Sequence, residues 1–272
     1  MTSDKENQIL CKRFQELARM AEYKYMNTFT SFLTLNEVSL FYQKINELPN
    51  IPFSIFGGTM DSERKMICFH GEEHLIEHAK RKGSHNEIML EMDEYQVIYP
   101  ITCIHISPVS QKFSDDLSHR DFLGAIMNLG IERSVIGDIL LEDNEGYVFC
   151  EEIIGDYIVE QLRKIKHTNV NCEKIQLKEF QIEPKFIEVF GTVSSVRLDA
   201  VISTAFKISR SKITGYIEGG KVFVNGKETV SNSYILKEND IVSVRGMGKF
   251  IYAGTAYQTK KGRYSITIRR YD

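Results

Sequence analysis

The sequence predicts an α+β protein of three folded units, and three observations support this. First, 272 residues with 42% hydrophobic content are enough for two or three domains with cores of their own. Second, stretches with helical periodicity alternate with short β-branched and aromatic runs along the chain. Third, charge is divided unevenly between the two ends. We expect a small α/β unit at residues 1–94, a second unit at 95–178, a linker at 179–194 and a third unit at 195–272.

The first unit is predicted to begin with a long amphipathic helix over residues 5–26. Candidates for its inner face are Ile9, Phe14, Leu17, Met20 and Ala21. Thr34 and Glu37 have the spacing of a capping box, which predicts a second helix as far as Leu48. Strand-like runs follow at residues 53–56 and 66–69, then a helix at 72–81 and a strand at 87–92.

The second unit is predicted to run strand, helix, strand, strand, helix, strand. Its expected strands are residues 97–106, 139–141, 147–150 and 170–177. Its first helix lies between residues 118 and 130, and its second carries the stripe Ile154, Ile158, Leu162 and Ile165. This order is the ferredoxin-like plan, which RRM-like RNA-binding modules share.

Two aromatic residues on the third strand of this unit, Tyr147 and Phe149, point to the same face because they are two residues apart. At this place in RRM-like domains, aromatic rings stack on RNA bases. Aromatic residues at strand spacing also pack in cores, so both interpretations stay open. Arg120 is a further candidate for this second RNA surface, while Asp121 beside it is expected to complete a capping box with Ser118.

The third unit is predicted to contain two short helices followed by a small sheet. Ser195 and Ser209 are candidate N-caps, because a serine hydroxyl can accept a hydrogen bond from a free first-turn amide. Asp199 is expected to be a first-turn acid. Asn225 and Gly226 tolerate positive φ, which predicts a tight hairpin turn. Further strands are expected at residues 222–224, 241–244, 250–257 and 264–271.

The charge of the third unit differs from that of the rest of the chain. Residues 195–272 hold 14 Lys and Arg against 6 Asp and Glu, a formal net charge of +8. The preceding 194 residues hold 20 and 31, a net charge of −11. A concentrated positive field attracts phosphates and releases their counterions. We therefore expect the third unit to bind nucleic acid and the acidic remainder to orient it or to contact protein.

Several motifs of the third unit resemble the RNA-binding domain first described in ribosomal protein S-four. They are R-L-D at 197–199, S-R at 209–210, V-x-V-N-G-K at 222–227 and N-D-x-V-x-V-R-G at 239–246. That family presents its second helix and the following turn to structured RNA, which implies contacts from Arg197, Ser209, Arg210, Lys212, Asn225 and Lys227. Nearby basic residues complete the predicted RNA-binding set: Lys207, Lys221, Arg245 and Lys249. Ser209 and Asn225 have an equally good interpretation as a helix cap and a turn residue.

A wider resemblance covers almost the whole chain. Its residues are Gly57-Gly58, Glu63-Arg64-Lys65, the H-R-D-F-L-G run that begins at His119, and Ile136-Gly137-Asp138-Ile139. Ahead of an S-four-type domain, these resemble the YlmH family of bacterial RNA-binding proteins. The resemblance implies a cytoplasmic factor of ribosome-associated quality control. Such a factor binds rRNA and tRNA on a large ribosomal subunit carrying peptidyl-tRNA and assists C-terminal tailing of the nascent chain, with other quality-control proteins as further partners and no membrane.

No catalytic residue, cofactor or metal is predicted. Glycine-rich nucleotide and cofactor loops are missing, and the five cysteines lie far apart without a C-x-x-C pair. His70, His74 and His78 could share a helix face, but a solvated polar face is the expected outcome. Two other classes of function stay open. One is an RNA-modifying enzyme, of pseudouridine synthase or methyltransferase type, with an appended RNA-binding domain; the other is a protein–protein adaptor in cell division or envelope organisation.

Overall fold

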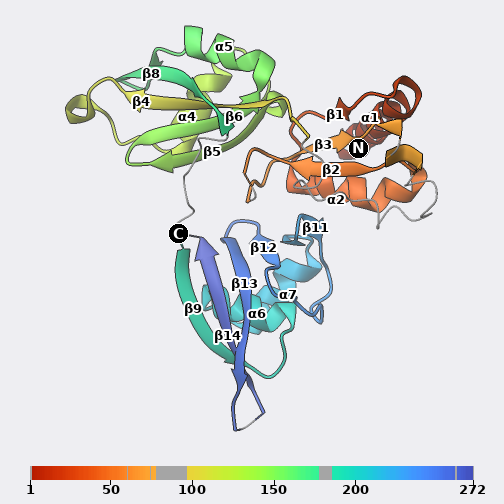
Figure 1. The fold of residues 1–272 in the computed structure, drawn as a ribbon. Coiled ribbons are helices and arrows are strands. Elements are labelled where there is room, and N and C mark those ends of the chain that lie inside the picture. Colours follow the sequence, from red (N-terminus) through yellow and green to blue (C-terminus); the bar gives the residue numbers. More distant parts are fainter. Residues whose placement is uncertain are drawn as a thin grey trace. The chain divides into compact units, whose positions relative to one another are not determined.

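The computed structural model describes residues 2–59, 61–73, 75–77, 97–177, 186–260 and 262–271. The chain divides into two compact units, Met1–Phe180 and Gln181–Asp272, here called the N-terminal unit and the C-terminal unit (Figure 1). Both combine helices with antiparallel sheets, so the predicted α+β class is confirmed. The strand predicted at residues 87–92 and most of the helix predicted at 72–81 lie outside the described residues.

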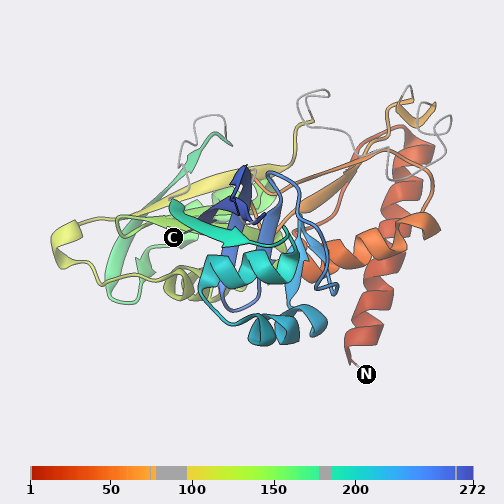
Figure 2. The same cartoon turned by 90° about the horizontal axis from the view of Figure 1, so that it is seen from below.

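The N-terminal unit begins with two helices that pack on a small sheet. The helices are α1 (Thr2–Lys24) and α2 (Leu35–Lys44), followed by a 3-10 turn at Ile45–Glu47. Figure 2 shows α1 crossing α2. The sheet has the order β1-β3-β2, with β1 at Thr28–Phe29, β2 at Phe53–Phe56 and β3 at Met66–Phe69.

The predicted start of α2 is confirmed, but the predicted inner face of α1 is only partly right. Thr34 N–H donates to Glu37 Oε2 at 2.7 Å, and Glu37 N–H donates to Thr34 Oγ1 at 3.4 Å, which completes the capping box. The buried stripe of α1 is formed by Phe14, Leu17, Ala18 and Ala21. Ile9 and Met20 lie off this stripe and are 68% and 36% exposed, since helical neighbours on one face recur at three and four residues.

The second sheet of the N-terminal unit has the predicted ferredoxin-like order. Its elements are β4 (Ile101–Pro108), α4 (His119–Met127), β5 (Ile136–Glu142), β6 (Glu145–Glu151), α5 (Glu152–Gln161), β7 (Lys164–Ile165) and β8 (Thr168–Ile175), with 3-10 turns at Gln111–Phe113 and Arg133–Val135. The strands lie in the order β5-β6-β4-β8-β7. Ile165 does not continue the helical stripe as predicted, because α5 ends at Gln161 and Ile165 lies in β7.

The two sheets of the N-terminal unit share a core. One face of the second sheet packs on α4 and α5 through residues such as Ile104, Phe122 and Ile158. The opposite face packs against the first sheet, where Phe149 joins Met66 of β3 in a second buried cluster. Each face of the second sheet is thus at least partly covered.

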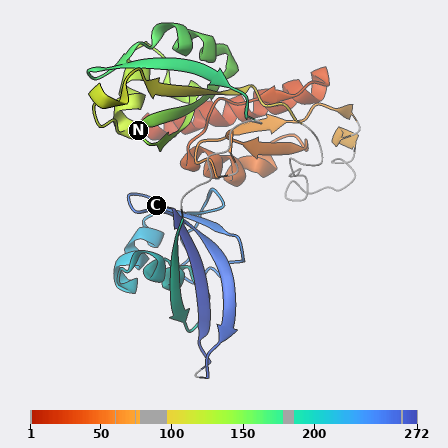
Figure 3. The same ribbon diagram turned by 60° about the vertical axis from the view of Figure 1, so that its left-hand side comes forward.

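In its described residues, the C-terminal unit forms a six-stranded sheet with two helices. Its elements are β9 (Phe186–Val193), α6 (Leu198–Phe206), α7 (Arg210–Glu218), β10 (Val222–Val224), β11 (Lys227–Glu228), β12 (Ile241–Val244), β13 (Gly248–Gln258) and β14 (Tyr264–Tyr271). The strand order is β11-β10-β12-β13-β14-β9. Figure 3 shows both helices on the same side of the sheet. They enclose a core that includes Val201, Ile213, Phe250 and Ile268.

The linker predicted at residues 179–194 is wrong over its second half. Residues 186–193 form β9, which pairs antiparallel with β14 from Phe186↔Tyr271 to Val193↔Tyr264. Gly191 fits this strand because a Cβ there would lie 2.3 Å from Thr204 Cγ2 on α6. Residues 186–193 are therefore an edge strand of the C-terminal unit and not part of a linker.

Candidate nucleic-acid interface

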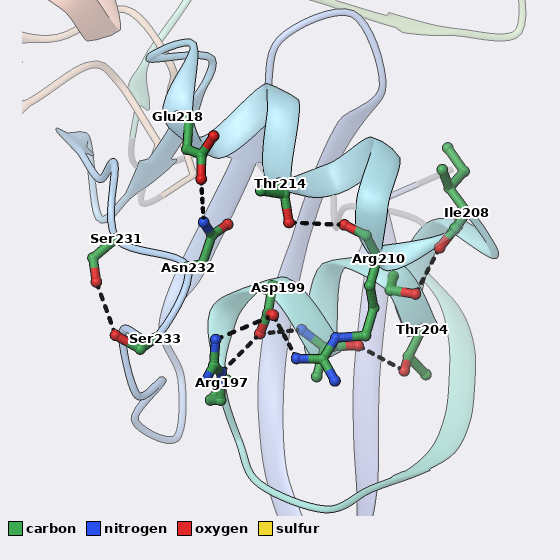
Figure 4. A network of polar contacts seen from close by, with 12 residues as sticks. Arg197, Asp199, Thr204, Ile208, Arg210, Thr214, Glu218, Ser231, Asn232 and Ser233 are labelled. Atoms are coloured by element: carbon green, nitrogen blue, oxygen red, sulfur yellow. Dashed lines mark hydrogen bonds and ion pairs between the residues drawn. The ribbon is translucent and has the colours of Figure 1, made fainter.

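The first turns of α6 and α7 place two predicted RNA-binding arginines around one buried carboxylate (Figure 4). The Asp199 side chain is only 6% exposed. Arg197 Nε donates to Asp199 Oδ1 at 3.1 Å, and Arg210 Nη2 donates to Oδ2 at 2.5 Å. The two arginine side chains remain 38% and 51% exposed. Asp199 therefore holds two guanidinium groups at the surface, each with further N–H donors for a ligand.

Asp199 stays ionised in this arrangement. Burial alone would raise its pKa, but hydrogen bonds from Arg210 and Arg197, with their positive charges, outweigh burial and lower the pKa of Asp199 below 3.8. The sequence predicts only a first-turn acid here, because two arginines that converge from different helices cannot be read from local spacing.

The N-terminus of α6 is held by a segment distant in sequence. The predicted N-cap Ser195 is wrong, since Arg197 occupies the N-cap position and makes no side-chain capping bond. Instead, Leu198 N–H donates to the carbonyl of Tyr234 at 2.8 Å. Arg197 also forms an isolated antiparallel bridge with Ile235. This crossing segment fixes the backbone from which the Arg197 side chain extends.

Ser209 is the N-cap residue of α7 by position, as predicted, but its hydroxyl does not cap the helix. Its carbonyl accepts from the Lys212 amide at 3.1 Å, and its hydroxyl lies 3.3 Å from Ser211 Oγ. Arg210 and Lys212 are exposed in the first turn of this helix. The positive end of the helix dipole thus coincides with two cationic side chains, which favours an anionic ligand.

Asn225 closes a turn with both ends of its side chain. Its Nδ2 donates to Asp240 Oδ1 at 2.8 Å, and its Oδ1 accepts from the Ile241 amide at 2.9 Å. Asn225 and Gly226 have φ values of 50° and 78°, as the predicted tight turn requires. The structure therefore assigns the amide of Asn225 to protein contacts, which position the exposed Lys227 at the start of β11.

The remaining cations of the predicted set lie at several places. Lys207 is exposed in the left-handed turn between α6 and α7, with φ 54°. The Arg245 amide donates to the Lys221 carbonyl at 2.8 Å, so these two residues are neighbours. Lys221 Nζ lies 5.3 Å from the ring centroid of Tyr216 on α7. Lys207 and Lys221 thus flank α7 along the chain, and Arg245 lies beside Lys221.

Lys249 is the exception. Its neighbour Phe250 points into the core, so Lys249 points to the sheet face away from α6 and α7. Its Nζ lies 4.3 Å from the ring centroid of Tyr271. A single basic surface around α7 cannot include it.

The second RNA surface is predicted on the sheet β5-β6-β4-β8-β7, here called the middle sheet, and the structure partly contradicts it. Phe149 is completely buried, so its ring is not available to stack on a base. Tyr147 lies on the same face and stacks on His105, with ring centroids 4.7 Å apart and planes at 17°. His105 in turn contacts two carboxylates, with Nε2 2.6 Å from Glu145 Oε2 and Nδ1 3.1 Å from Glu173 Oε1. The uncovered part of this face is acidic, which disfavours phosphate.

Arg120 remains exposed near the start of α4. Asp121 completes the predicted capping box, since the Ser118 amide donates to Asp121 Oδ2 at 2.8 Å. Lys166 Nζ lies 2.7 Å from the same oxygen. Hydrogen bonds from Lys166 and then Ser118 lower the pKa of Asp121 to about 2. The H-R-D triplet therefore contains one structural acid, and Arg120 stays a candidate contact.

Other residues of the wider resemblance meet at the junction of the two N-terminal sheets. Asp138 accepts the amides of Glu63 at 2.6 Å and of Arg64 at 3.1 Å. The Arg64 guanidinium donates to the carbonyls of Phe32 at 2.8 Å and Ile136 at 2.9 Å. These side chains bind the backbone of the protein and lock the first sheet onto the second.

The described residues contain no cluster of three or more His, Cys, Asp and Glu that could hold a metal. His70 is buried with Nε2 2.8 Å from Ser54 Oγ, while His74 and His78 lie outside the described residues. Burial raises the pKa of the Cys68 and Cys103 thiols to about 12. No helix in the described ranges is long and apolar enough to cross a membrane.

Two family models match parts of this chain, and one curated relative and one solved structure are similar to it. A family model described as "Putative RNA-binding domain in YlmH" matches residues 94–179, and a model of the S4 domain matches residues 196–242. A curated relative, "Ribosome-associated protein quality control protein P2" of Bacillus subtilis (strain 168), is 28% identical over 256 residues, which are 94% of this chain and 91% of the relative. A solved structure, "Cell division protein ylmH from Streptococcus pneumoniae", has a TM-score of 0.44 and 21% identity, covering 64% of this chain and 93% of that one.

Fold, charge and domain content together define an RNA-binding protein. The predicted resemblance is confirmed at the level of domains: the chain contains a YlmH-type RNA-binding domain followed by an S4 domain, the S-four-type domain of the sequence analysis.

Proposed function

We propose that the C-terminal unit binds structured rRNA or tRNA on a large ribosomal subunit that carries peptidyl-tRNA, and that the chain acts in ribosome-associated quality control. The observation that carries this proposal is the pair of guanidinium groups held by Asp199, with Lys212 in the same first turn of α7. They belong to a segment with a formal net charge of +8. The other contacts we propose come from Lys207, Lys221, Lys227 and Arg245.

The geometry suits phosphate better than base edges. A guanidinium presents several donors in a rigid fork, which matches phosphate oxygens. Holding Arg197 and Arg210 on one carboxylate reduces the side-chain freedom lost on binding, because the two groups are already ordered. A-form RNA hides its major groove and is recognised largely by shape, so cations fixed on a rigid helix pair are sufficient.

The ribosomal assignment rests on the relative named for ribosome-associated quality control, which aligns with 94% of this chain. In that setting we propose a cytoplasmic, non-catalytic role in tailing the nascent chain on stalled peptidyl-tRNA. The acidic N-terminal unit would orient the S4 domain or contact further quality-control proteins, because its net negative charge opposes phosphate binding.

The direct test is co-sedimentation of the full chain with large ribosomal subunits. Arg210→Gln with Lys212→Gln should weaken binding, and the slope of log affinity against log salt should fall by about one per lost phosphate contact. Glutamine is preferable to glutamate at position 210, because a carboxylate there would face Asp199. The matched control is Lys112→Gln with Lys164→Gln, which removes two exposed cations from the N-terminal unit.

Equal co-sedimentation and equal salt slopes for the two double variants would overturn the proposal. A separate comparison concerns catalysis: mass spectrometry of rRNA and tRNA from cells with and without the protein should show the same modifications. A lost modification would favour the RNA-modifying enzyme instead.

A further inference from the structure

One face of the C-terminal sheet carries aromatic and cationic side chains, and no helix of the described residues lies over it. Since α6 and α7 cover the other side (Figure 3), we call this the outer sheet face. Phe186 and Tyr271 pair across β9 and β14, and so do Phe190 and Thr267 four residues further along β9. Side chains two residues apart on a strand share a face. The outer sheet face therefore includes Phe186, Glu188, Phe190, Lys249, Arg269 and Tyr271.

The rings and cations of this face are in contact with one another. Lys249 Nζ lies 4.3 Å from the Tyr271 ring centroid. The Tyr271 and Phe186 rings meet edge to face at 4.8 Å, and the Arg269 guanidinium lies 5.5 Å from the Phe186 ring. These contacts order the side chains into one surface in which positive charge adjoins aromatic faces.

Phe190 extends this surface and is 68% exposed. Its position on an edge strand leaves the ring accessible from the side as well as from above. Glu188 is paired in register with Arg269, so the one acid among these residues faces a cation across the strands. An exposed phenylalanine beside positive charge is the combination that sequence-tolerant single-strand binding uses, with stacking for bases and cations for the backbone.

We propose that the outer sheet face binds unpaired nucleotides of RNA. Their bases stack on Phe190, and their phosphates contact Arg269 and Lys249. The inference rests on the proposed RNA binding by this unit but adds a second surface and a different ligand class, because α7 serves folded RNA and this face serves single-stranded RNA. The occupant follows from charge complementarity. The face belongs to a segment of net charge +8, and cations interrupt its apolar area, whereas the cores of protein interfaces are depleted of charge.

The test uses the full-length protein and two fluorescent RNA probes, a short oligouridine and a perfectly paired hairpin. Phe190→Ala should weaken oligouridine binding by about fivefold or more, since base–aromatic stacking is a main source of single-strand affinity, and should change hairpin binding by less than about twofold. Phe190→Leu should behave like Phe190→Ala, because leucine keeps apolar bulk without a ring. The control is Ile187→Ala, an exposed apolar residue on the other face of β9.

The outcomes separate the two proposals. If Phe190→Ala binds oligouridine like the wild type, the outer sheet face is not a base-stacking surface, while hairpin binding lost in Arg210→Gln with Lys212→Gln would still support the role of α7. If oligouridine binding depends on Phe190 but hairpin binding ignores both α7 substitutions, the assignment of α7 fails instead. A change in oligomeric state on Phe190→Ala without RNA, measured by light scattering, would make this face an interface between copies and overturn the inference.

Discussion

The second sheet of the N-terminal unit, which belongs to the YlmH RNA-binding domain, and the sheet of the C-terminal unit differ in the side chains that their helix-free faces expose to RNA. In the first, Phe149 is completely buried beneath the neighbouring sheet, and the part around His105 is flanked by Glu145 and Glu173. In the second, Phe190 is 68% exposed on the same sheet face as Lys249 and Arg269. Charge follows the same division, since residues 97–177 hold 7 Lys and Arg against 13 Asp and Glu, a net charge of −6.

This difference shows that a fold shared with RNA-binding modules does not determine which face is free. In the middle sheet, the aromatic positions typical of base stacking are present, but the first 69 residues of the chain supply side chains that cover them, such as Phe32 and Met66. The aromatic residue that is exposed on a sheet face lies in the C-terminal unit instead, on strand β9, which the sequence analysis assigns to a linker. Function must therefore be assigned from the exposed site and not from the fold.

The largest expected effect tests the covered face. Phe149→Ala should destabilise the N-terminal unit by about 3–5 kcal/mol, because it removes a fully buried ring and leaves a cavity. RNA affinity, measured below the unfolding temperature, should not change. Chemical denaturation and filter binding measure the two quantities, with Tyr147→Ala as the partly exposed neighbour. Loss of RNA affinity with intact stability in the Phe149 variant would restore the base-stacking role.

A second substitution tests the packing between the two sheets of the N-terminal unit. Gly58 has φ +105°, and a Cβ there would lie 2.2 Å from Phe149 Cδ1. Gly58→Ala should therefore cost about 2–4 kcal/mol through backbone strain and overpacking. Gly124→Ala is the control, because nothing lies within 4 Å of its Cβ position in α4. Replacing a glycine inside a helix by alanine should stabilise the protein by about 0.5–1 kcal/mol. Similar thermal unfolding of both variants would contradict a role for Gly58 in the packing between the two sheets.

Much of the fold could be predicted because its signals are local. The Thr34–Glu37 capping box, the Asn225-Gly226 turn and the order of elements in the middle sheet need only neighbouring residues. Strand β9 cannot be predicted from local signals, because its partner β14 lies more than 70 residues away and because glycine, as at Gly191, is typical of loops. Only the tertiary contact with Thr204 explains the glycine.

The candidate site was predictable to the level of residue type and no further. Charge and motifs identify Arg197 and Arg210, but not the carboxylate of Asp199 that joins them. The burial of Phe149 is likewise a tertiary property, since the residues that cover it come from another sheet. Lys249 has the right charge and lies on the other side of its sheet, which only strand register reveals.

A smaller effect tests the arginine pair. Asp199→Asn should destabilise the C-terminal unit by about 1–3 kcal/mol, since a buried ionic hydrogen-bond partner of two arginines is lost. The pKa of Asp199 is lowered in the folded state. The ionised carboxylate therefore stabilises the fold fully above pH 3.8, and this contribution is lost as the pH falls through the pKa of the folded state. Urea unfolding of the wild type should therefore show an extra loss of stability in acid that the variant lacks. Hairpin RNA affinity should also fall, and unchanged affinity would mean that ordering the two arginines is irrelevant to binding.

The smallest expected effect concerns His105, which marks the middle sheet face as acidic. Burial alone would lower its pKa, but hydrogen bonds with Glu173 and Glu145 and their charges outweigh burial and raise the pKa of His105 above 6.5. The raised value means that this pairing stabilises the fold fully below pH 6.5 and less as the pH rises through the folded pKa. Glu173 is 71% exposed, so solvent screening keeps the effect below about 1 kcal/mol. An NMR titration should find His105 protonated above pH 6.5, and His105→Gln should flatten the pH dependence of stability there. A normal or lowered pKa would show that the two glutamates leave this face less negative than the geometry indicates, and RNA binding by the middle sheet would then need to be tested again.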